Sequence, residues 1–251
     1  MKKKISKADW KVRVDLAAMF RLTHMFGWDD TVWNHITARA PGTKHNFFMH
    51  EMGLLYEEVK ASNLIKVDEN GKVLEGPKKA NTAGFIIHSA VHLNHPKNKF
   101  VFHAHPPSAL AATALKNGIP FLVQDSSMLY GKVGYHEWEG LSLNKDERKR
   151  IAKNLGNNKV LIMKNHGLLT VGETAGEAFM NMYYAIRMCE VAVQAEGSGL
   201  KLERCTKQMW KLSQKQYDLF SPGLNEWPAL LRRCDKACLL YTSPSPRDVV
   251  P

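Results

Sequence analysis

Two histidines separated by one residue carry the strongest indication of chemistry in this sequence. His103 and His105 end the apolar, β-rich run at residues 100–104 and are followed at once by two prolines. On a strand, residues i and i+2 point to the same face, so both imidazoles project side by side from the end of a buried strand. Two imidazoles placed in this way can share one divalent cation.

A third histidine follows another apolar run. His166 lies between Asn165 and Gly167, directly after residues 160–163. Gly167 permits a sharp turn with positive φ, which can aim the imidazole inward. Three neutral histidines around zinc, iron or manganese leave a coordination position free for water or substrate. Because no carboxylate ligand neutralises the ion, such a site favours an anionic ligand. We therefore predict one divalent metal at His103, His105 and His166, with zinc first and iron or manganese as alternatives.

The helices and strands that position these residues can be predicted from the periodicity of the apolar residues and from residues that end helices and strands. A long helix from Thr174 begins with a capping box, in which Thr174 and Glu177 satisfy backbone amides reciprocally. Mixed strands and helices of these lengths predict a sheet covered by helices on both faces. The predicted helices cover residues 8–25, 82–95, 108–118, 145–155 and 174–196, and the predicted strands 33–40, 46–49, 64–74 (as a hairpin), 100–104, 160–163 and 168–171.

Composition limits the classes of function. The chain has 251 residues and a net charge of +11, enough for one sizeable α/β domain. Lysines and arginines are scattered, without a basic stripe or a nucleic-acid motif, so we expect a small anionic substrate and no nucleic acid. No apolar run approaches the roughly 20 residues of a membrane span, and no apolar segment follows the basic N-terminus. We therefore expect a cytoplasmic protein that does not enter the membrane.

The last residues break the pattern before them. Residues 238–248 read CLLYTSPSPRD, which back-translates into a transposase-type sequencing adapter. We therefore expect one domain over residues 1–237, followed by a translated adapter at 238–251 that is excluded from the fold.

Four segments together resemble the class II aldolase/adducin family, over about residues 9–233. They are WNHITAR at 33–39, AGFIIHSAVH at 83–92, VFHAH at 101–105 and KNHGLL at 164–169, and GYHEWEG at 134–140 resembles the bacterial adducin-like branch. The resemblance implies a three-layer α/β/α sandwich with a central mixed, largely antiparallel sheet. It also implies a homodimer or homotetramer with sites between subunits, and it places the three metal ligands of the family on His103, His105 and His166.

One departure from the aldolase pattern concerns proton transfer. Aldolases of the family carry a catalytic glutamate nineteen residues before the first metal histidine, where this chain has Gly84. Glycine cannot move the proton of an enediolate. We therefore predict negligible cleavage of sugar phosphates, and we expect the space left by Gly84 to admit a bulkier ligand or a second substrate oxygen. The family's phosphate pocket is only partly retained, at Thr82 and Gly53.

Other candidate residues come from the same motifs. Asn34 and Arg39 are candidates for binding the substrate anion, with a structural turn as the alternative interpretation. Tyr130 and Glu139 are candidate acid/base groups. His88 and His92 are spaced i, i+4 and could bind metal, but we interpret them, like the remaining histidines, as packing or surface residues: His24, His35, His45, His50 and His136.

The resulting hypothesis is a metal-dependent aldolase-like enzyme of lyase or isomerase type. It would act on a small oxygenated anion through a metal-stabilised enolate. One alternative is a non-haem iron oxygenase on the same fold, because three histidines with open positions also suit iron. Another alternative is a non-catalytic, adducin-like binding module. Metal analysis would separate the three.

Overall fold

The computed structural model describes residues 5–42, 45–76 and 80–237. The segment assigned to a translated adapter, 238–251, lies outside the described residues, as do the side chains of Thr82 and Ala83. In the described part of the chain, no helix has both the length and the apolarity needed to cross a membrane.

One eight-stranded sheet forms the middle of the molecule, in the order β4-β3-β2-β1-β5-β8-β7-β6. Every neighbouring pair is antiparallel except β6 and β7, which are parallel. The predicted mixed, largely antiparallel sheet is therefore confirmed. Its strands are β1 (His35–Arg39), β2 (Phe47–Met49), β3 (Ile65–Val67), β4 (Val73–Glu75), β5 (Phe100–Ala104), β6 (Val133–His136), β7 (Val160–Met163) and β8 (Gly167–Gly172).

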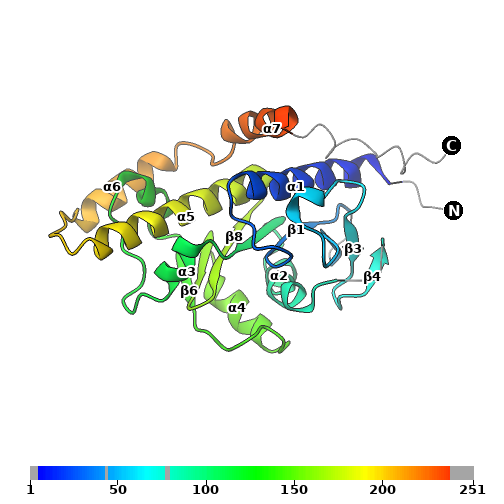
Figure 1. The fold of residues 1–251 in the computed structure, drawn as a ribbon, viewed down its shortest axis with the longest axis horizontal. Coiled ribbons are helices and arrows are strands. Elements are labelled where there is room, and N and C mark those ends of the chain that lie inside the picture. The colour runs from blue at the N-terminus through cyan, green and yellow to red at the C-terminus, as the bar shows by residue number, and fades with distance from the viewer. Residues whose placement is uncertain (1–4, 43–44, 77–79, 238–251) are drawn as a thin grey trace.

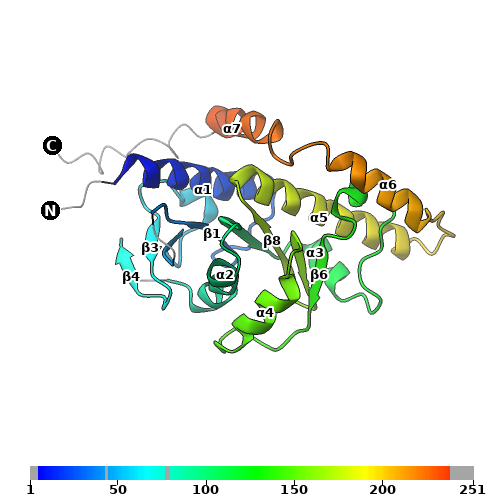
Figure 2. The same ribbon diagram turned by 180° about the vertical axis from the view of Figure 1, so that it is seen from behind.

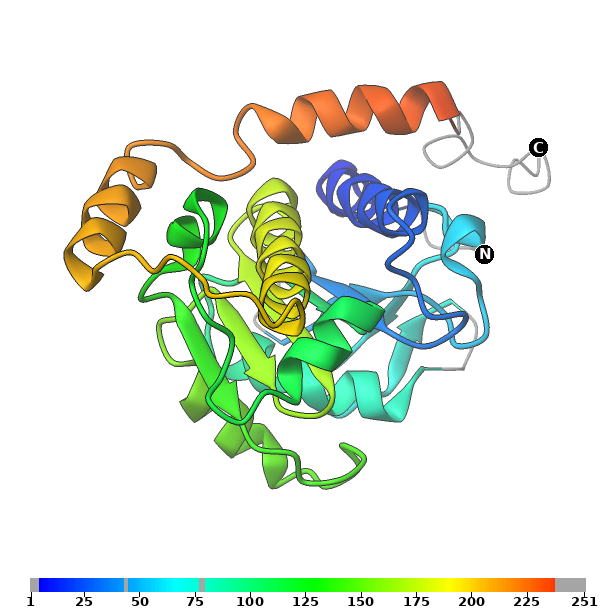
Figure 3. The same ribbon diagram turned by 60° about the vertical axis from the view of Figure 1, so that its left-hand side comes forward.

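Helices cover both faces of this sheet (Figures 1 and 2). One layer holds α1 (Lys7–Met25), α3 (Pro107–Thr113) and α5 (Ala175–Gly197), and the other holds α2 (Thr82–Asn94) and α4 (Glu147–Leu155). Outside the first layer, α7 (Glu226–Ala237) contacts α1 and α5, and α6 (Lys207–Tyr217) packs on the short helix η2 (Gln124–Leu129), as Figure 3 shows. A further short helix, η1 (Tyr56–Glu58), contacts α1. The α/β/α sandwich is confirmed.

The alternation of strand residues decides which layer meets the predicted metal histidines. In β5, Phe100 and Phe102 join the core under α1 and α5, whereas Val101 joins the core under α2 and α4. His103 is two residues after Val101 and therefore projects toward the α2/α4 layer. By the same alternation His35 and Thr37 of β1 face α2, because Ile36 belongs to the α1/α5 core.

The predicted elements are nearly all present, and the structure adds the helices α6 and α7, which were not predicted. Three further differences concern α3, β6 and the start of α5. The helix after the two prolines ends at Thr113, not near residue 118. The parallel edge strand β6 was not predicted, because three of its four residues are only partly buried or exposed and carry no apolar alternation. At the start of α5, the Thr174 hydroxyl accepts from the Glu177 amide at 3.1 Å, but the Glu177 carboxylate accepts from the Glu173 amide and not from Thr174.

Candidate metal centre

The three predicted ligands meet at one edge of the central strands. β5 and β8 are antiparallel, with Ala104 paired to Leu168, so the end of β5 lies beside the turn that precedes β8. This turn carries His166, and it brings the three imidazole rings to centroid separations of 4.5, 4.8 and 5.0 Å. One potential ligand atom from each ring lies within 4.8 Å of the others. Two nitrogens bound to one zinc ion at about 2.1 Å lie at most about 4.2 Å apart, so the rings are close to the required spacing.

Hydrogen bonds fix which ring nitrogens are free. His103 donates from Nδ1 to the Leu168 carbonyl at 2.9 Å, and His105 donates from Nδ1 to the Asp30 carboxylate at 3.3 Å. In neutral imidazoles both Nε2 atoms then carry lone pairs, and these atoms face each other at 2.8 Å. Two lone pairs repel at this distance unless a cation lies between them. The donor set therefore fits a shared metal ion, and both Nδ1 bonds are of the type that orients metal-bound histidines.

The protein holds these histidines neutral. Burial lowers the pKa of His103 well below its ordinary value, with the neighbouring histidines adding to the effect. Burial also lowers the pKa of His105, against an opposing effect from Asp30, and lowers that of His166 to about 4. Because a metal binds only the unprotonated imidazole, protons compete weakly for this site at neutral pH.

Gly167 is required by contact as well as by conformation. Its φ is +151°, in agreement with the positive φ predicted for this turn. A Cβ at this position would lie 2.6 Å from Cδ2 of His105 and 2.7 Å from the Ala104 carbonyl oxygen. The bare backbone of Gly167 therefore leaves the space in which the His105 ring lies.

A cavity of about 640 Å³ opens over the histidines. Its walls are mostly apolar, and Leu141, Trp138 and Leu143 at its mouth are 81, 61 and 60% exposed. In the part of the chain that the structure describes, no lysine or arginine lines it. The lining residues are Asp30, Trp33, Asn34, His35, Met52, Asn81, Ile87, His105, Trp138, Gly140, Leu141, Ser142, Leu143 and His166.

The expected open space at Gly84 does not exist. A Cβ on Gly84 would lie 2.3 Å from Cδ2 and 2.5 Å from Cγ of His35. The imidazole of His35 therefore fills the volume that a side chain at position 84 would need, and the prediction of extra ligand space there was wrong. His35 also stacks on the ring of His103, with centroids 5.5 Å apart and planes 11° apart. Sequence reasoning had assigned His35 to packing, although its place in the WNHITAR motif was a usable signal.

Of the other predicted substrate residues, Asn34 lines this cavity, whereas Gly53 and Thr82 are sequence neighbours of lining residues. Asn34 has φ of +66° and donates from its amide to the Trp28 carbonyl at 3.2 Å, while its buried Oδ1 has no partner among the described residues. Gly53 has φ of +97° and follows Met52 in the cavity wall. Thr82 begins α2 beside the cavity residue Asn81.

Arg39, Tyr130 and Glu139 also do not line the cavity. Arg39 lies at the far end of β1 from His35, about 13 Å along the strand, where its guanidinium donates to the His92 carbonyl. Tyr130 packs against Phe121, with ring centroids 5.1 Å apart. Glu139 accepts two hydrogen bonds from Nε of Arg150 at 2.7 and 3.0 Å. This pairing lowers the pKa of Glu139, which favours its ionised form.

The histidines of α2 form a polar cluster of their own. Nδ1 of His88 and Nε2 of His92 each lie 2.7 Å from the hydroxyl oxygen of Thr37. One nitrogen of each ring contacts this hydroxyl, so the two histidines are arranged around Thr37 of β1 and not around a common metal ion. The packing interpretation of the two residues fits this geometry.

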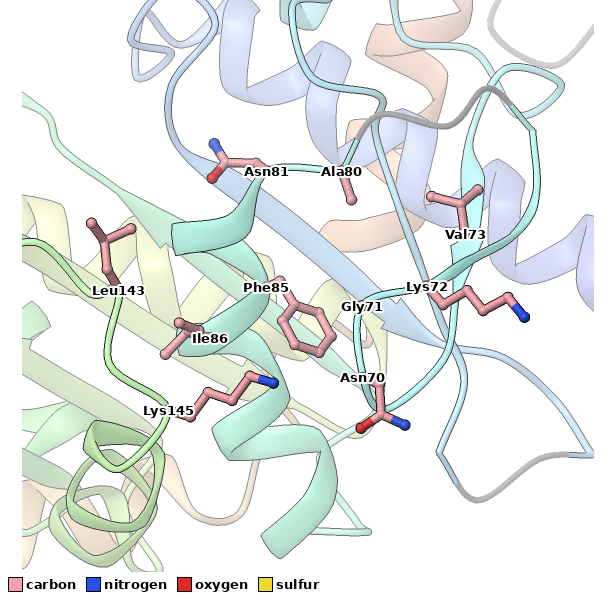
Figure 4. Close-up of a pocket in the computed structure, with 10 residues that line it drawn as sticks. All are labelled: Asn70, Gly71, Lys72, Val73, Ala80, Asn81, Phe85, Ile86, Leu143 and Lys145. Carbon is pink, nitrogen blue, oxygen red and sulfur yellow. The ribbon is translucent and has the colours of Figure 1, made fainter.

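A second cavity, of about 480 Å³, lies beside the first (Figure 4). It is bounded by the β3–β4 turn, by α2 and by the loop around Leu143 and Lys145, and it shares Asn81 and Leu143 with the first cavity. Figure 4 shows the Asn81 amide turned away from Phe85, and its Oδ1 accepts from the Gly84 amide at 3.0 Å. None of the three metal-site histidines lines this second cavity.

Comparison with known proteins gives a consistent result. Residues 14–193 match the family described as class II aldolase and adducin N-terminal domain. A Caulobacter vibrioides protein named for class 2 aldolases is 39% identical over 242 residues, which are 94% of this chain and 93% of that protein. Rat alpha-adducin is 37% identical over 196 residues, covering 76% of this chain but 26% of the adducin.

Solved structures agree with the sequence comparisons. An aldolase II superfamily protein from Pseudomonas syringae superimposes with a TM-score of 0.91 at 33% identity, covering 96% of this chain and 98% of that chain. L-fuculose 1-phosphate aldolase from Glaciozyma antarctica gives a TM-score of 0.82 at 26% identity, covering 96% of each chain. The similarity therefore includes the outer helices as well as the sheet.

Proposed function

The chain belongs to the class II aldolase and adducin family, and from this membership we propose that it is a metal-dependent, aldolase-like enzyme of lyase or isomerase type. Its substrate would be a small oxygenated anion. The observation that supports this proposal most directly is the pair of Nε2 atoms, 2.8 Å apart, in two rings whose Nδ1 atoms both have acceptors. A cation between the two rings would stabilise this arrangement.

Each residue of the site has a definable task. His103, His105 and His166 would hold the ion, and Asp30 would keep His105 in the tautomer that presents Nε2. Zinc is our first choice, with iron or manganese as alternatives. When bound, the cation would supply Lewis-acid polarisation of a substrate carbonyl. Asn34, with an unpaired buried Oδ1, is placed to bind a substrate hydroxyl at the cavity wall.

The charges of the site favour an anion. Three neutral imidazoles leave the full charge of a divalent cation uncompensated within the ligand set. Asp30 is the one acidic residue that lines the cavity among the described residues, and it is engaged by His105. A small anion can therefore bind at the ion without an opposing carboxylate in contact.

The test is the metal content of purified protein. We expect about one divalent ion per chain, and we expect His103→Ala, His105→Ala or His166→Ala to abolish tight binding. His24→Ala is a matched control, since His24 is an exposed histidine paired with Asp29 outside the cavity. A His166→Ala protein that retained its full metal content would contradict the proposed site.

Similarity to alpha-adducin supports a second candidate, a binding module without catalysis. Metal-free wild-type protein would favour that candidate. Iron as the resident metal, together with oxygen consumption, would favour an oxygenase. Cleavage of L-fuculose 1-phosphate should be negligible in every case, because position 84 lacks the glutamate used by aldolases of the family, and a missing general acid/base typically lowers the rate by about 10²–10⁴-fold.

A further inference from the structure

His35 has hydrogen-bonding capacity that nothing in the described structure uses. Its ring is 5% exposed, yet it lines the metal cavity together with His105 and His166. The Nδ1 atom is buried and has no hydrogen-bond partner. A buried polar atom without a partner costs free energy, so an unpaired nitrogen in a ring that lines a cavity indicates a group that a ligand completes.

Three neighbours hold the ring in place. It stacks in parallel on the metal-site residue His103 at 5.5 Å, and it meets the edge of His88 at 5.5 Å with an interplanar angle of 88°. The Cδ2 edge lies against Gly84, where even one methyl group would approach to 2.3 Å. His35 therefore has a defined orientation, and that orientation depends on the absence of a side chain at position 84.

The surroundings decide what kind of contact the ring can offer. The rings of His88 and His103 pack against His35. A neutral imidazole in this place has one N–H donor and one lone pair. A neutral imidazole can donate a hydrogen bond to an anionic ligand without adding charge to the site. A carboxylate at this place would instead repel an anionic ligand.

We propose that His35 contacts the substrate, donating a hydrogen bond to an oxygen of the anion that binds at the His103, His105 and His166 centre. Gly84 acts by leaving the His35 ring its space. The glutamate position of the aldolases is thus replaced by an imidazole from the neighbouring strand. This inference rests on the proposed metal function.

The same geometry narrows the class of substrate. The ligand would carry an ionised carboxylate and a second oxygen on the adjacent carbon. These groups suit a metal ion that has the neutral His35 ring beside it as a hydrogen-bond donor. The remaining cavity is apolar at Trp138, Leu141 and Leu143 and has no described lysine or arginine in its lining to pair with a phosphate. We therefore assign the site to small 2-hydroxy or 2-keto acids with an apolar substituent, in preference to sugar phosphates.

Binding of oxalate to the cobalt-loaded protein tests the contact. Oxalate is a simple carboxylate with adjacent oxygens, and the visible absorption of cobalt reports its binding. We expect His35→Ala to keep one metal per chain while its Kd for oxalate rises about 10- to 100-fold, the loss typical of a hydrogen bond to a charged group. His35→Gln retains an N–H donor and should recover part of the affinity, whereas His24→Ala should bind as wild type.

The outcomes separate this inference from the proposed function. A His35→Ala protein with full metal and wild-type oxalate affinity overturns the role of His35 alone. Loss of metal from His35→Ala would assign the ring to supporting His103, which also overturns a substrate contact. Wild-type protein that binds no metal overturns both proposals.

A double-mutant cycle tests the dependence on Gly84. Gly84→Ala should weaken oxalate binding and lower the free energy of unfolding in the wild-type background, because the new methyl group displaces the His35 ring. In a His35→Ala background the same change should have little effect on either quantity. Gly197→Ala is the matched control, since that helical glycine has open space around its Cβ position. Equal effects of Gly84→Ala in both backgrounds would contradict the pairing.

Discussion

At the scale of single residues, Asp30 lies outside the histidine triad but contacts one of the three proposed ligands. Its carboxylate accepts from Nδ1 of His105 at 3.3 Å and so selects the tautomer with a free Nε2. We predict that Asp30→Ala lowers metal affinity about 10- to 100-fold, as loss of an orienting partner typically does. Competition with a chromogenic chelator measures this.

The adjacent residue provides the control for that measurement. Asp29 has the same side chain but pairs with His24 at 2.8 Å, outside the cavity. Asp29→Ala should leave metal affinity unchanged. Equal losses in the two variants would show that general surface charge, and not the orientation of His105, determines affinity.

Buried histidines away from the metal also give the fold a defined response to pH. Burial lowers the pKa of His50 to about 4 and is the main cause that lowers the pKa of His92 to about 3. In the unfolded chain both titrate near about 6.5, so below that pH the unfolded state binds more protons than the folded state. The stability that these neutral rings contribute is complete above pH 6.5 and is lost as pH falls toward 4, by about 1.4 kcal/mol per pH unit for each group.

Replacing one ring tests this account. His50 lies between Phe20 and Tyr56, with centroids 4.9 and 5.7 Å away, so an aromatic replacement suits its surroundings. We predict that His50→Phe reduces the dependence of the free energy of unfolding on pH between 7 and 5, measured by urea titration of metal-free protein. His45→Gln, at an exposed histidine, should keep the wild-type slope, and an unchanged slope in His50→Phe would refute the explanation.

At the scale of elements, the turn between β7 and β8 carries His166 to the end of β5, where His103 and His105 lie. We predict that Gly167→Ala lowers both metal affinity and thermal stability, because its Cβ would lie 2.6 Å from the His105 ring. Metal titration and thermal unfolding measure the two effects. Gly131 also has positive φ, +74°, but has open space around its Cβ position. Gly131→Ala should therefore cost only conformational strain, about 1 kcal/mol, with normal metal binding.

At the scale of the whole molecule, exposed apolar side chains predict self-association. Leu141 and Leu143 at the cavity mouth are 81 and 60% exposed, and Leu219 and Phe220 after α6 are 82 and 67% exposed. Family membership makes a homodimer or homotetramer our expectation. We predict that Leu141→Glu with Leu143→Glu shifts sedimentation toward a smaller species.

Leu74→Glu is the control for that experiment, because Leu74 is 47% exposed on β4, away from the cavity lining. It should sediment as wild type. A wild-type protein that is monomeric at micromolar concentration would remove the basis of the prediction.

Much of the fold was accessible from sequence because its determinants are local. The apolar run at 100–104 specified β5, and the two-residue period of a strand specified that His103 and His105 share a face. Glycine after His166 specified a turn with positive φ. The longest helices followed from apolar periodicity and, for α5, from the capping residue Thr174. These features depend on neighbours within a few residues, which a sequence displays directly.

Tertiary structure decided which side chains fill the space around those histidines. The absence of a side chain at Gly84 was visible in the sequence, but the ring of His35 in its place depends on β1 packing beside α2. Similarly, Asp30 reaches His105 across 75 positions of sequence, while Arg39 is carried to the far end of its strand and Glu139 is paired with Arg150. Local patterns fix the direction of a side chain, but only the packing of distant segments fixes what that side chain meets.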